Sequence, residues 1–417
     1  SSLMANTNKA DTGGNGLMKW IDDRLPVTPL IEMSMTKYYA GWNFNFWYYM
    51  GSLSLLVLVI QILSGIFLTM HYKPDAELAF ASVEYIMRDV EWGWLIRYMH
   101  STGASFFFIL VYLHMFRSLL YGSHRAPREL VWVFGMLIYL TLMAEAFMGY
   151  VLPWGQMSYW GAQVIINLFG AIPYIGEGLT EWIRGDYFIS DATLNRFFAL
   201  HVIALPLALL GRIMMHLMAL HENGSNNPDG IDVAPHEDEE GNPPVDGIPF
   251  HPYYTVKDIF GVGFFLMIFA FVIFFWPEAG GLFLEHDNFV PANPLVTPEH
   301  IKPVWYFTPY YAILKAVPDK LMGVILMFAA VGILFFLPWL DRSPVKSIRY
   351  KGAWYKIMLA MFTIAFVRLG MLGMAEGTPA QTIEMRVWTF VYFSFFILMY
   401  FISPGGKTKP VPERLTH

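Results

Sequence analysis

The chain has 417 residues, of which 56% are hydrophobic and 14% charged, and its formal net charge is -6. This apolar content exceeds what the core of a soluble domain of this length needs, so the composition predicts a membrane protein. No basic stripe is available for nucleic acid, and the absence of cysteine excludes disulfides, cysteine-ligated iron–sulfur clusters and thioether-attached haem.

Residues 1–24 are polar and contain no apolar core of the signal-peptide type, so we expect the first spanning helix to drive insertion. Eight later segments are apolar and approach the length of about 20 residues that one membrane crossing requires. They are residues 46–71, 98–121, 131–152, 197–221, 257–276, 320–340, 354–374 and 385–403. The sequence therefore predicts an all-α membrane protein with eight transmembrane helices: a four-helix bundle followed by a C-terminal four-helix part.

Lysine and arginine predict the orientation of these helices. They gather before the first helix, in the second and sixth connections and in the tail, at Lys19, Arg24, Lys37, Arg117, Arg125, Arg128, Arg342, Lys346, Arg349, Lys351, Lys407, Lys409 and Arg414. Cytoplasmic loops carry such an excess, so both termini are expected in the cytoplasm. The expected parts are an inner segment 1–45, the bundle 46–221, an inner loop 222–256, helices with an outer loop 257–403, and an inner tail 404–417.

Two of the expected helices each carry two histidines in apolar surroundings. His100 and His114 are fourteen residues apart, which places them within about 40° of one helix face and about 21 Å apart along the axis. His201 and His216 lie on the fourth helix. Two ligands on each helix predict two metal centres, and haem fits best because two imidazoles supply both axial positions of its iron. Hydrogen bonding to a neighbouring carbonyl is the alternative role for each histidine.

Four glycines repeat the same fourteen-residue spacing. Gly51 and Gly65 lie on the first helix, and Gly135 and Gly149 on the third. A missing side chain at each level would let a flat macrocycle approach the backbone, although close helix packing is the alternative explanation. Three residues outward from each histidine of the second helix stand Arg97 and Arg117, which could pair with haem propionates or extend to lipid headgroups.

Several motifs resemble a known family. They are WNF at 42–44, RYMH at 97–100, GYVLPWGQMSYWGA at 149–162, HENGSNNP at 221–228 and PVWY at 303–306. Together they resemble cytochrome b of the respiratory quinol:cytochrome c oxidoreductase (complex III). The resemblance covers nearly the whole chain and implies a quinone-cycle enzyme in the bacterial inner membrane. It also implies two noncovalent b-type haems, a Rieske iron–sulfur protein, a c-type cytochrome subunit, bound lipid and a homodimer of the complex.

The resemblance further implies where each ligand binds. His100 and His201 would hold a low-potential haem near the outer face, and His114 and His216 a high-potential haem near the inner face. Quinol, expected to be ubiquinol, would be oxidised beside the outer haem, with one electron passing to the Rieske protein and the other to the haems. The implied outer pocket is formed by Phe147, Tyr150, Gly161, Pro303, Val304, Trp305 and Tyr306. The implied inner quinone pocket is formed by His221, Ser225, Lys257 and Asp258, of which His and Asp are suited to proton donation.

One position departs from the family pattern. The commonest form of the outer motif is PEWY, whose glutamate is thought to accept a quinol proton, but this chain has Val304. Two carboxylates could replace it: Glu145, inside the third helix, and Glu285, in the outer loop where the family more often has histidine. We expect Glu285 to serve as the proton acceptor, with Glu145 as the rival, and a solvated loop glutamate is the alternative for Glu285.

The fourth helix also departs from the mitochondrial pattern, because His201 and His216 are fifteen residues apart instead of fourteen. On a regular helix they would be about 60° apart. We therefore predict a π-bulge between residues 205 and 212, loosened by Pro206. Arg212 is a charge within this helix, for which Glu145, a haem propionate or a water-lined crevice are candidate partners.

Two other classes of protein remain alternatives. A transporter or proton channel could use membrane histidines without metal, but transporters usually show related broken helices, and none is evident. Another dihaem cytochrome, such as a dehydrogenase anchor, would lack the PVWY and GYVLPWG loops.

Overall fold

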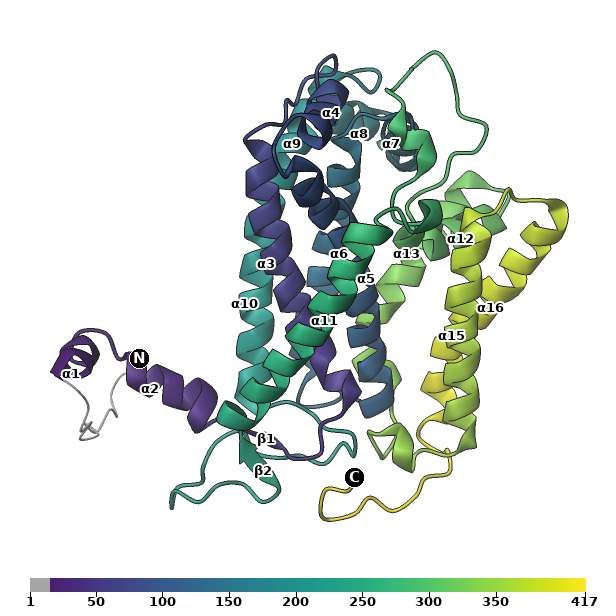
Figure 1. Cartoon of the computed structure of the whole chain (residues 1–417). Coiled ribbons are helices and arrows are strands. Elements are labelled where there is room, and N and C mark those ends of the chain that lie inside the picture. Colours follow the sequence, from purple (N-terminus) through teal and green to yellow (C-terminus); the bar gives the residue numbers. More distant parts are fainter. Residues whose placement is uncertain (1–15) are drawn as a thin grey trace.

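A computed structural model describes residues 16–417, so residues 1–15 of the expected inner segment lie outside the described residues. Long apolar helices stand side by side and form most of the molecule (Figure 1). The helices are α1 (Gly16–Asp22), α2 (Val27–Ile31), α3 (Tyr49–Thr69), α4 (Ala79–Arg88), α5 (Gly93–Tyr121), α6 (Glu129–Val151), α7 (Gln156–Phe169), α8 (Gly176–Arg184), α9 (Asp191–Ala199), α10 (Leu205–Asn223), α11 (Thr255–Phe275), α12 (Thr308–Ala316), α13 (Lys320–Phe335), α14 (Leu337–Leu340), α15 (Ala353–Met374) and α16 (Pro379–Ile402).

Within the described chain, seven helical segments are long and apolar enough to cross a membrane. They are Phe46–Thr69, Gly93–Tyr121, Glu129–Val151, Asp191–Asn223, Phe250–Phe275, Ala353–Met374 and Pro379–Ile402, which matches seven of the eight predicted segments. The predicted segment 320–340 is broken into α13 and α14. At 16 residues, α13 is about 24 Å long, less than the membrane core of about 30 Å. An eighth crossing stays a prediction.

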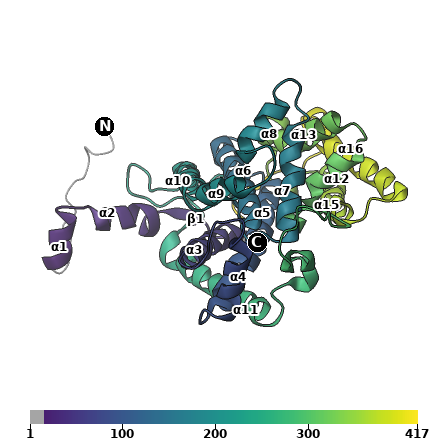
Figure 2. The ribbon, with the colours of Figure 1, turned by 90° about the horizontal axis from the view of Figure 1, so that it is seen from above.

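The spanning helices form two groups. In the first, α3 packs against α5 and α6 packs against α10; in the second, α12, α15 and α16 pack against one another. Seen from above, the two groups lie side by side, and α1 and α2 extend away from them (Figure 2). One continuous hydrophobic core runs through both groups.

The connections differ between the two ends of the bundle. Helices α4, α7, α8 and α9 gather at the upper end, and the described N-terminal helices and the C-terminus lie toward the lower end (Figure 1). We call these the outer and inner ends. At the inner end, β1 (Tyr39–Gly41) pairs antiparallel with β2 (Gly247–Pro249), with Ala40 opposite Ile248. This small sheet is a minor departure from the predicted all-α fold.

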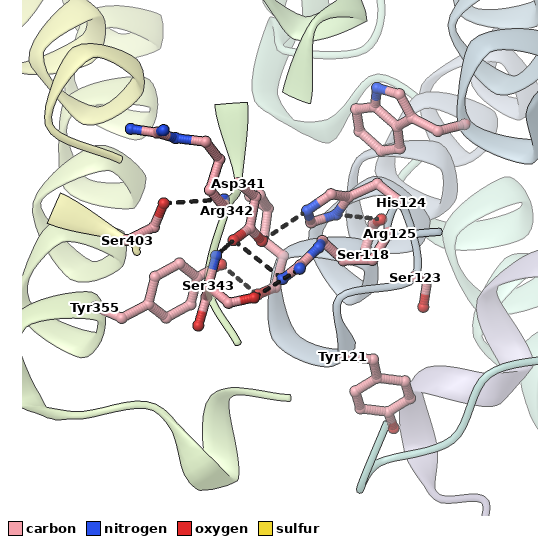
Figure 3. Close-up of polar contacts among 12 residues, drawn as sticks. Ser118, Tyr121, Ser123, His124, Arg125, Asp341, Arg342, Ser343, Tyr355 and Ser403 are labelled. Atoms are coloured by element: carbon pink, nitrogen blue, oxygen red, sulfur yellow. Dashed lines mark hydrogen bonds and ion pairs between the residues drawn. The ribbon is translucent and has the colours of Figure 1, made fainter. Parts of the chain in front are cut away.

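A buried charged cluster joins the two helix groups near the inner end (Figure 3). Its centre is Asp341, which follows α14. One carboxylate oxygen lies 2.9 Å from Nε2 of His124 and 3.2 Å from Nζ of Lys351, and the other accepts from Arg125 at 3.3 Å. The side chains of Asp341, His124 and Lys351 are fully buried. Burial raises the pKa of Asp341, but the charge of Lys351 and the hydrogen bond from His124 outweigh it, so the pKa lies below its usual value.

Candidate functional site

The four predicted histidines face one another in two pairs. His100 on α5 lies opposite His201, with ring centroids 6.2 Å apart, and His114 on α5 lies opposite His216 on α10, with centroids 6.4 Å apart. Two imidazoles that share one metal ion, with each nitrogen about 2.0–2.1 Å from it, have centroids about 6 Å apart. Each pair therefore has the separation that two axial ligands require.

Hydrogen bonds orient three of the four rings. Nδ1 of His201 lies 2.7 Å from the carbonyl oxygen of Glu145, and Nδ1 of His216 lies 2.8 Å from that of Val131. A carbonyl can only accept, so each Nδ1 donates its proton and Nε2 keeps a lone pair for a metal. Nδ1 of His100 meets the hydroxyl of Ser64 at 2.9 Å, and this hydroxyl already donates to the carbonyl of Ile60. His100 is thereby fixed in the same tautomer.

The four glycines each lie against one of these histidines. A Cβ added at Gly51 would be 3.1 Å from Cε1 of His114, and one added at Gly65 would be 3.1 Å from Cε1 of His100. Gly135 and Gly149 face His216 and His201 in the same way. Each missing side chain makes room for an imidazole, because the glycine and histidine helices pack directly together. The approach of a macrocycle to the backbone at these glycines stays a prediction.

Coordination by protein side chains alone would be incomplete. Across residues 16–417, no group of three or more His, Cys, Asp or Glu side chains could hold a metal ion. An ion between two imidazoles would need further ligands from outside the chain, which the four nitrogens of a porphyrin would supply. The paired rings and the glycine gaps fit a macrocycle such as haem.

A cavity of about 510 Å³ opens beside the outer histidine pair. Its lining includes His100, His201, Gly65 and Gly149 together with Arg97, Glu145, Tyr150, Val304 and Tyr306. Two of the expected outer-pocket tyrosines and the valine of PVWY therefore share one space with the outer histidines. The predicted residues Phe147, Gly161, Pro303 and Trp305 are not on its lining; Phe147 packs against Phe197, and Nε1 of Trp305 donates to Ser105.

Glu285 is not on the cavity lining, but the preceding residue, Leu284, is. Its side chain is 7% exposed, and its Oε2 has no hydrogen-bond partner among the described residues. Burial raises the pKa of Glu285 to about 7, against the lowering effect of Lys302. Burial and the neighbouring Glu285 carboxyl together raise the pKa of Tyr306, so these two groups interact. The solvated-loop alternative for Glu285 is wrong.

Glu145 does line the cavity, but its carboxyl contacts a histidine. Oε1 lies 3.0 Å from Nδ1 of His201, and Oε2 has no partner among the residues that the structure describes.

Glu145 was also a candidate partner for Arg212. That expectation was wrong, because Nη1 of Arg212 donates to the hydroxyl of Thr141 and, at 3.3 Å, to the carbonyl of Leu137.

The expected inner-pocket residues lie at the inner end, where His221 and Ser225 are both neighbours of Tyr38. The ring of His221 stacks on Tyr38 with centroids 4.5 Å apart, and its Nδ1 donates to the carbonyl of Leu217. Nζ of Lys257 reaches the carbonyl of Phe44 at 3.4 Å. Oδ1 of Asp258 is buried without a hydrogen-bond partner in the described chain. No hydrogen bond joins His221, Ser225, Lys257 and Asp258 to one another within residues 16–417.

The two predicted propionate-binding arginines occupy different environments. Arg97 lines the outer cavity. Arg117 donates from Nη2 to the carbonyl of Asn226 at 3.2 Å, while its Nε is buried and unsatisfied within the described residues. An unsatisfied buried donor is costly and fits an anionic ligand group such as a propionate.

The extra residue of the fourth helix is absorbed in a π turn, but not where we predicted. The π segment is Leu200–Ala204 and includes His201, whereas α10 runs as an α-helix from Leu205. The physical reason is that a proline disturbs the helical turn that precedes it. Pro206 has no N–H to donate, and its ring clashes with the carbonyl four residues earlier. The turn before it is therefore loosened, and the predicted bulge at 205–212 was wrong in position.

Three further residues contribute to the site and were not predicted from the sequence. Ser64 holds His100, the Nε2 of Gln61 donates to the carbonyl of His100 at 2.8 Å, and Tyr38 stacks on His221. Gln61 lies four residues before Gly65 and therefore on the same helix face, so helical periodicity could have found it. Ser64 directly precedes Gly65, and periodicity does not indicate it. Tyr38 precedes the first span, and no local signal marks it.

Family models, curated relatives and a solved structure all match this chain, and together they cover most of its length. Residues 35–224 match the family model described as cytochrome b/b6/petB, and residues 291–393 match that of the cytochrome b C-terminal part, b6/petD. The chain is 60% identical over 408 residues to cytochrome b of Allochromatium vinosum, covering 96% of this chain and 98% of that one. It is 50% identical over 406 residues to cytochrome b of Rickettsia bellii, covering 96% and 97%. A solved structure titled hyperthermophilic respiratory Complex III aligns with a TM-score of 0.85 and 38% identity, covering 93% of this chain and 98% of that chain.

Proposed function

The chain belongs to the cytochrome b family, and from that premise we propose that it is the cytochrome b subunit of a quinol:cytochrome c oxidoreductase. In this role it oxidises quinol near the outer end, passes electrons between two b-type haems and reduces quinone near the inner end. The observation that carries the proposal is the pair of facing imidazoles at each level, 6.2 and 6.4 Å apart by ring centroid.

His100 and His201 would hold the outer, low-potential haem, and His114 and His216 the inner, high-potential one. Bound haems would supply one-electron carriers that connect the two ends of the bundle. The chain itself orients the ligating rings through the hydrogen bonds at Nδ1, and its glycines admit the rings between the helices.

In the outer pocket, Tyr150, Val304 and Tyr306 would contact the quinol head group. Val304 cannot accept a proton, so we assign this role to Glu285, with Glu145 as the rival. A carboxyl with a pKa of about 7 is matched to its task, because it accepts a proton at neutral pH and releases it readily. One electron of the quinol would go to a Rieske protein and then to a c-type cytochrome, and the other across the bundle, with two protons leaving on the outer side.

At the inner end, His221 and Asp258 would donate protons to a reduced quinone, and Ser225 and Lys257 would bind its carbonyl oxygens. The unpartnered Oδ1 of Asp258 supports this role. The quinone is proposed to be ubiquinone. We also propose an inner-membrane location with cytoplasmic termini, an eighth crossing near 320–340, bound lipid and a homodimeric complex.

A reduced-minus-oxidised spectrum of the purified complex tests the proposal. We expect two b-type absorbance components, with the His201→Ala variant losing only the outer one and the His216→Ala variant only the inner one. A wild-type complex without haem absorbance would overturn the proposal and favour a proton-conducting transporter. Copurification of a Rieske protein distinguishes complex III from another dihaem cytochrome.

A further inference from the structure

Arg212 is a charged side chain in the middle of the first helix group. It lies on α10, four residues before His216 and eleven after His201. Its guanidinium reaches across to α6, where it donates to Thr141 and to the carbonyl of Leu137. Intramembrane charges are rare and usually functional, and the quinone and haem sites described above leave this one without a role.

The depth of Arg212 separates it from both membrane surfaces. Thr141 is one residue from the midpoint of α6 (Glu129–Val151), so the guanidinium lies about 15 Å or more from either end of that helix. A side chain at this depth does not reach lipid headgroups. Its acceptors are a hydroxyl and a carbonyl, and no carboxylate of residues 16–417 lies within 4.0 Å of it. The positive charge is therefore not neutralised by the described chain.

The guanidinium also lies between the two histidine levels. On α6 these levels are marked by Gly135 opposite His216 and by Gly149 opposite His201. Thr141 is six residues from Gly135 and eight from Gly149, and Leu137 is only two from Gly135. The charge is therefore nearer the inner level.

We propose that Arg212 is a fixed cation that stabilises electrons on the haems of this bundle, and more strongly on the inner haem. The inference rests on the proposed function. Haem held by these histidines would supply one-electron transfer from quinol toward quinone, with no bond formed or broken. Added negative charge is attracted by the guanidinium, and the attraction is stronger in an apolar interior than in water. Because Arg212 is nearer the inner level, it favours transfer from the outer to the inner haem.

Redox titration of the purified complex, followed in the haem absorbance bands, tests this role. The Arg212→Gln variant keeps hydrogen-bond donors but loses the charge. At the wild-type midpoint potential, we expect the reduced-to-oxidised ratio of the inner haem to fall about tenfold in this variant. This corresponds to a midpoint potential lower by about 59 mV for a one-electron couple. The shift at the outer haem should be smaller.

Two matched variants separate charge from packing. Arg212→Lys retains the charge, and Thr141→Val removes a hydrogen bond but no charge, so both should titrate within about twofold of the wild type. If Arg212→Gln fails to assemble, Thr141→Asp provides a second approach, because a carboxylate beside the intact guanidinium should lower the inner midpoint potential in the same direction.

Unchanged midpoint potentials in a fully haem-loaded Arg212→Gln or Thr141→Asp complex would overturn the proposal. An equal shift in Arg212→Lys would also overturn it, because that result assigns the effect to packing. Absence of haem from the wild-type complex would instead be a failure of the proposed function.

Discussion

At the scale of single residues, the glycines opposite the histidines differ in how closely the imidazoles approach. The Cβ position of Gly149 is within 2.9 Å of both ring nitrogens of His201, whereas that of Gly135 comes no nearer than 3.3 Å to any atom of His216. His201 is therefore packed more tightly against the backbone than His216, whereas His100 and His114 approach their glycines equally closely, at 3.1 Å.

This difference predicts unequal effects of adding a methyl group. Gly149→Ala should displace His201 at an overpacking cost of about 1–3 kcal/mol and remove most of the outer haem. Gly135→Ala should cost less and leave most of the inner haem bound. The haem-to-protein ratio and the two absorbance components measure both effects, and equal loss in the two variants would contradict this reading.

Glu285 leads to a pH prediction. Its pKa of about 7 means that the carboxylate form, which alone accepts a proton, increases as pH rises through 7. Quinol oxidation should therefore rise over this range in the wild type. In Glu285→Gln this dependence should disappear and the rate fall by about 10²-fold or more, the usual contribution of a general base. Steady-state rates of the purified complex between pH 5.5 and 8.5, about 1.5 units on either side of that pKa, provide the measurement.

Glu145→Gln is the matched control, because Glu145 contacts His201 and also lines the cavity. We expect it to retain the rise in rate with pH. Loss of the rise in Glu145→Gln alone would transfer the role to Glu145, and wild-type behaviour in both variants would reject both carboxylates.

At the scale of helices, the π turn Leu200–Ala204 allows His201 and His216, which are fifteen residues apart, to lie on the same face of their helix and meet the histidines of α5. A π turn accommodates one extra residue, so the remaining spacing is equivalent to the fourteen residues that separate His100 and His114 in α5. π turns commonly lie at functional sites, and here the turn contains the ligand candidate His201.

Deleting one residue tests this equivalence. Removal of Ile203 should convert the π turn to a regular α-helix, keep His201 facing inward and preserve both haems. Removal of Ile109 from α5, which has no π turn, should rotate one histidine by about 100° and release a haem. Haem content and thermal unfolding of the two deletion variants measure the contrast.

Much of this layout could be predicted from sequence because it depends on local patterns. Apolar length located seven spans to within seven residues at each end. Regular spacing along the helices pointed to the histidines and to the glycines that lie against them. Contacts between distant segments were not predictable in the same way. The stacking of Tyr38 on His221 and the hydrogen bond from Arg212 to Thr141 depend on how helices pack, and no local pattern encodes either.

At the scale of the whole molecule, the Asp341 cluster joins the helix group that contains α5 to the group that contains α15 and α16. Asp341→Asn should leave the buried Lys351 without its counter-charge and destabilise the protein by about 3–5 kcal/mol. The midpoint of thermal unfolding in detergent measures the loss. The exposed pair Lys37 and Glu32 is the control, since Lys37→Ala should cost about 1 kcal/mol or less.

The same cluster gives stability a defined pH dependence. The pKa of Asp341 is lower in the folded protein than its usual value. Its contribution to the free energy of unfolding is therefore fully present when the pH is above the ordinary pKa range of a carboxyl group. The contribution is lost as pH falls from the unfolded pKa of about 3.9 through the lower folded value. Acid unfolding of Asp341→Asn should lack this component, and an unchanged acid profile in the variant would contradict the assignment.

The burial of these cations also has a consequence for biogenesis. Arg125, Arg128 and Lys351 belong to the basic residues expected to orient the helices during insertion, when they must be accessible to the translocation machinery and the membrane surface. In the folded protein their side chains are 18%, 4% and 0% exposed. On the predicted orientation, the charges that orient the chain are later enclosed by it. We therefore expect insertion to precede closure of the inner end, and misoriented intermediates to be correctable only before that closure.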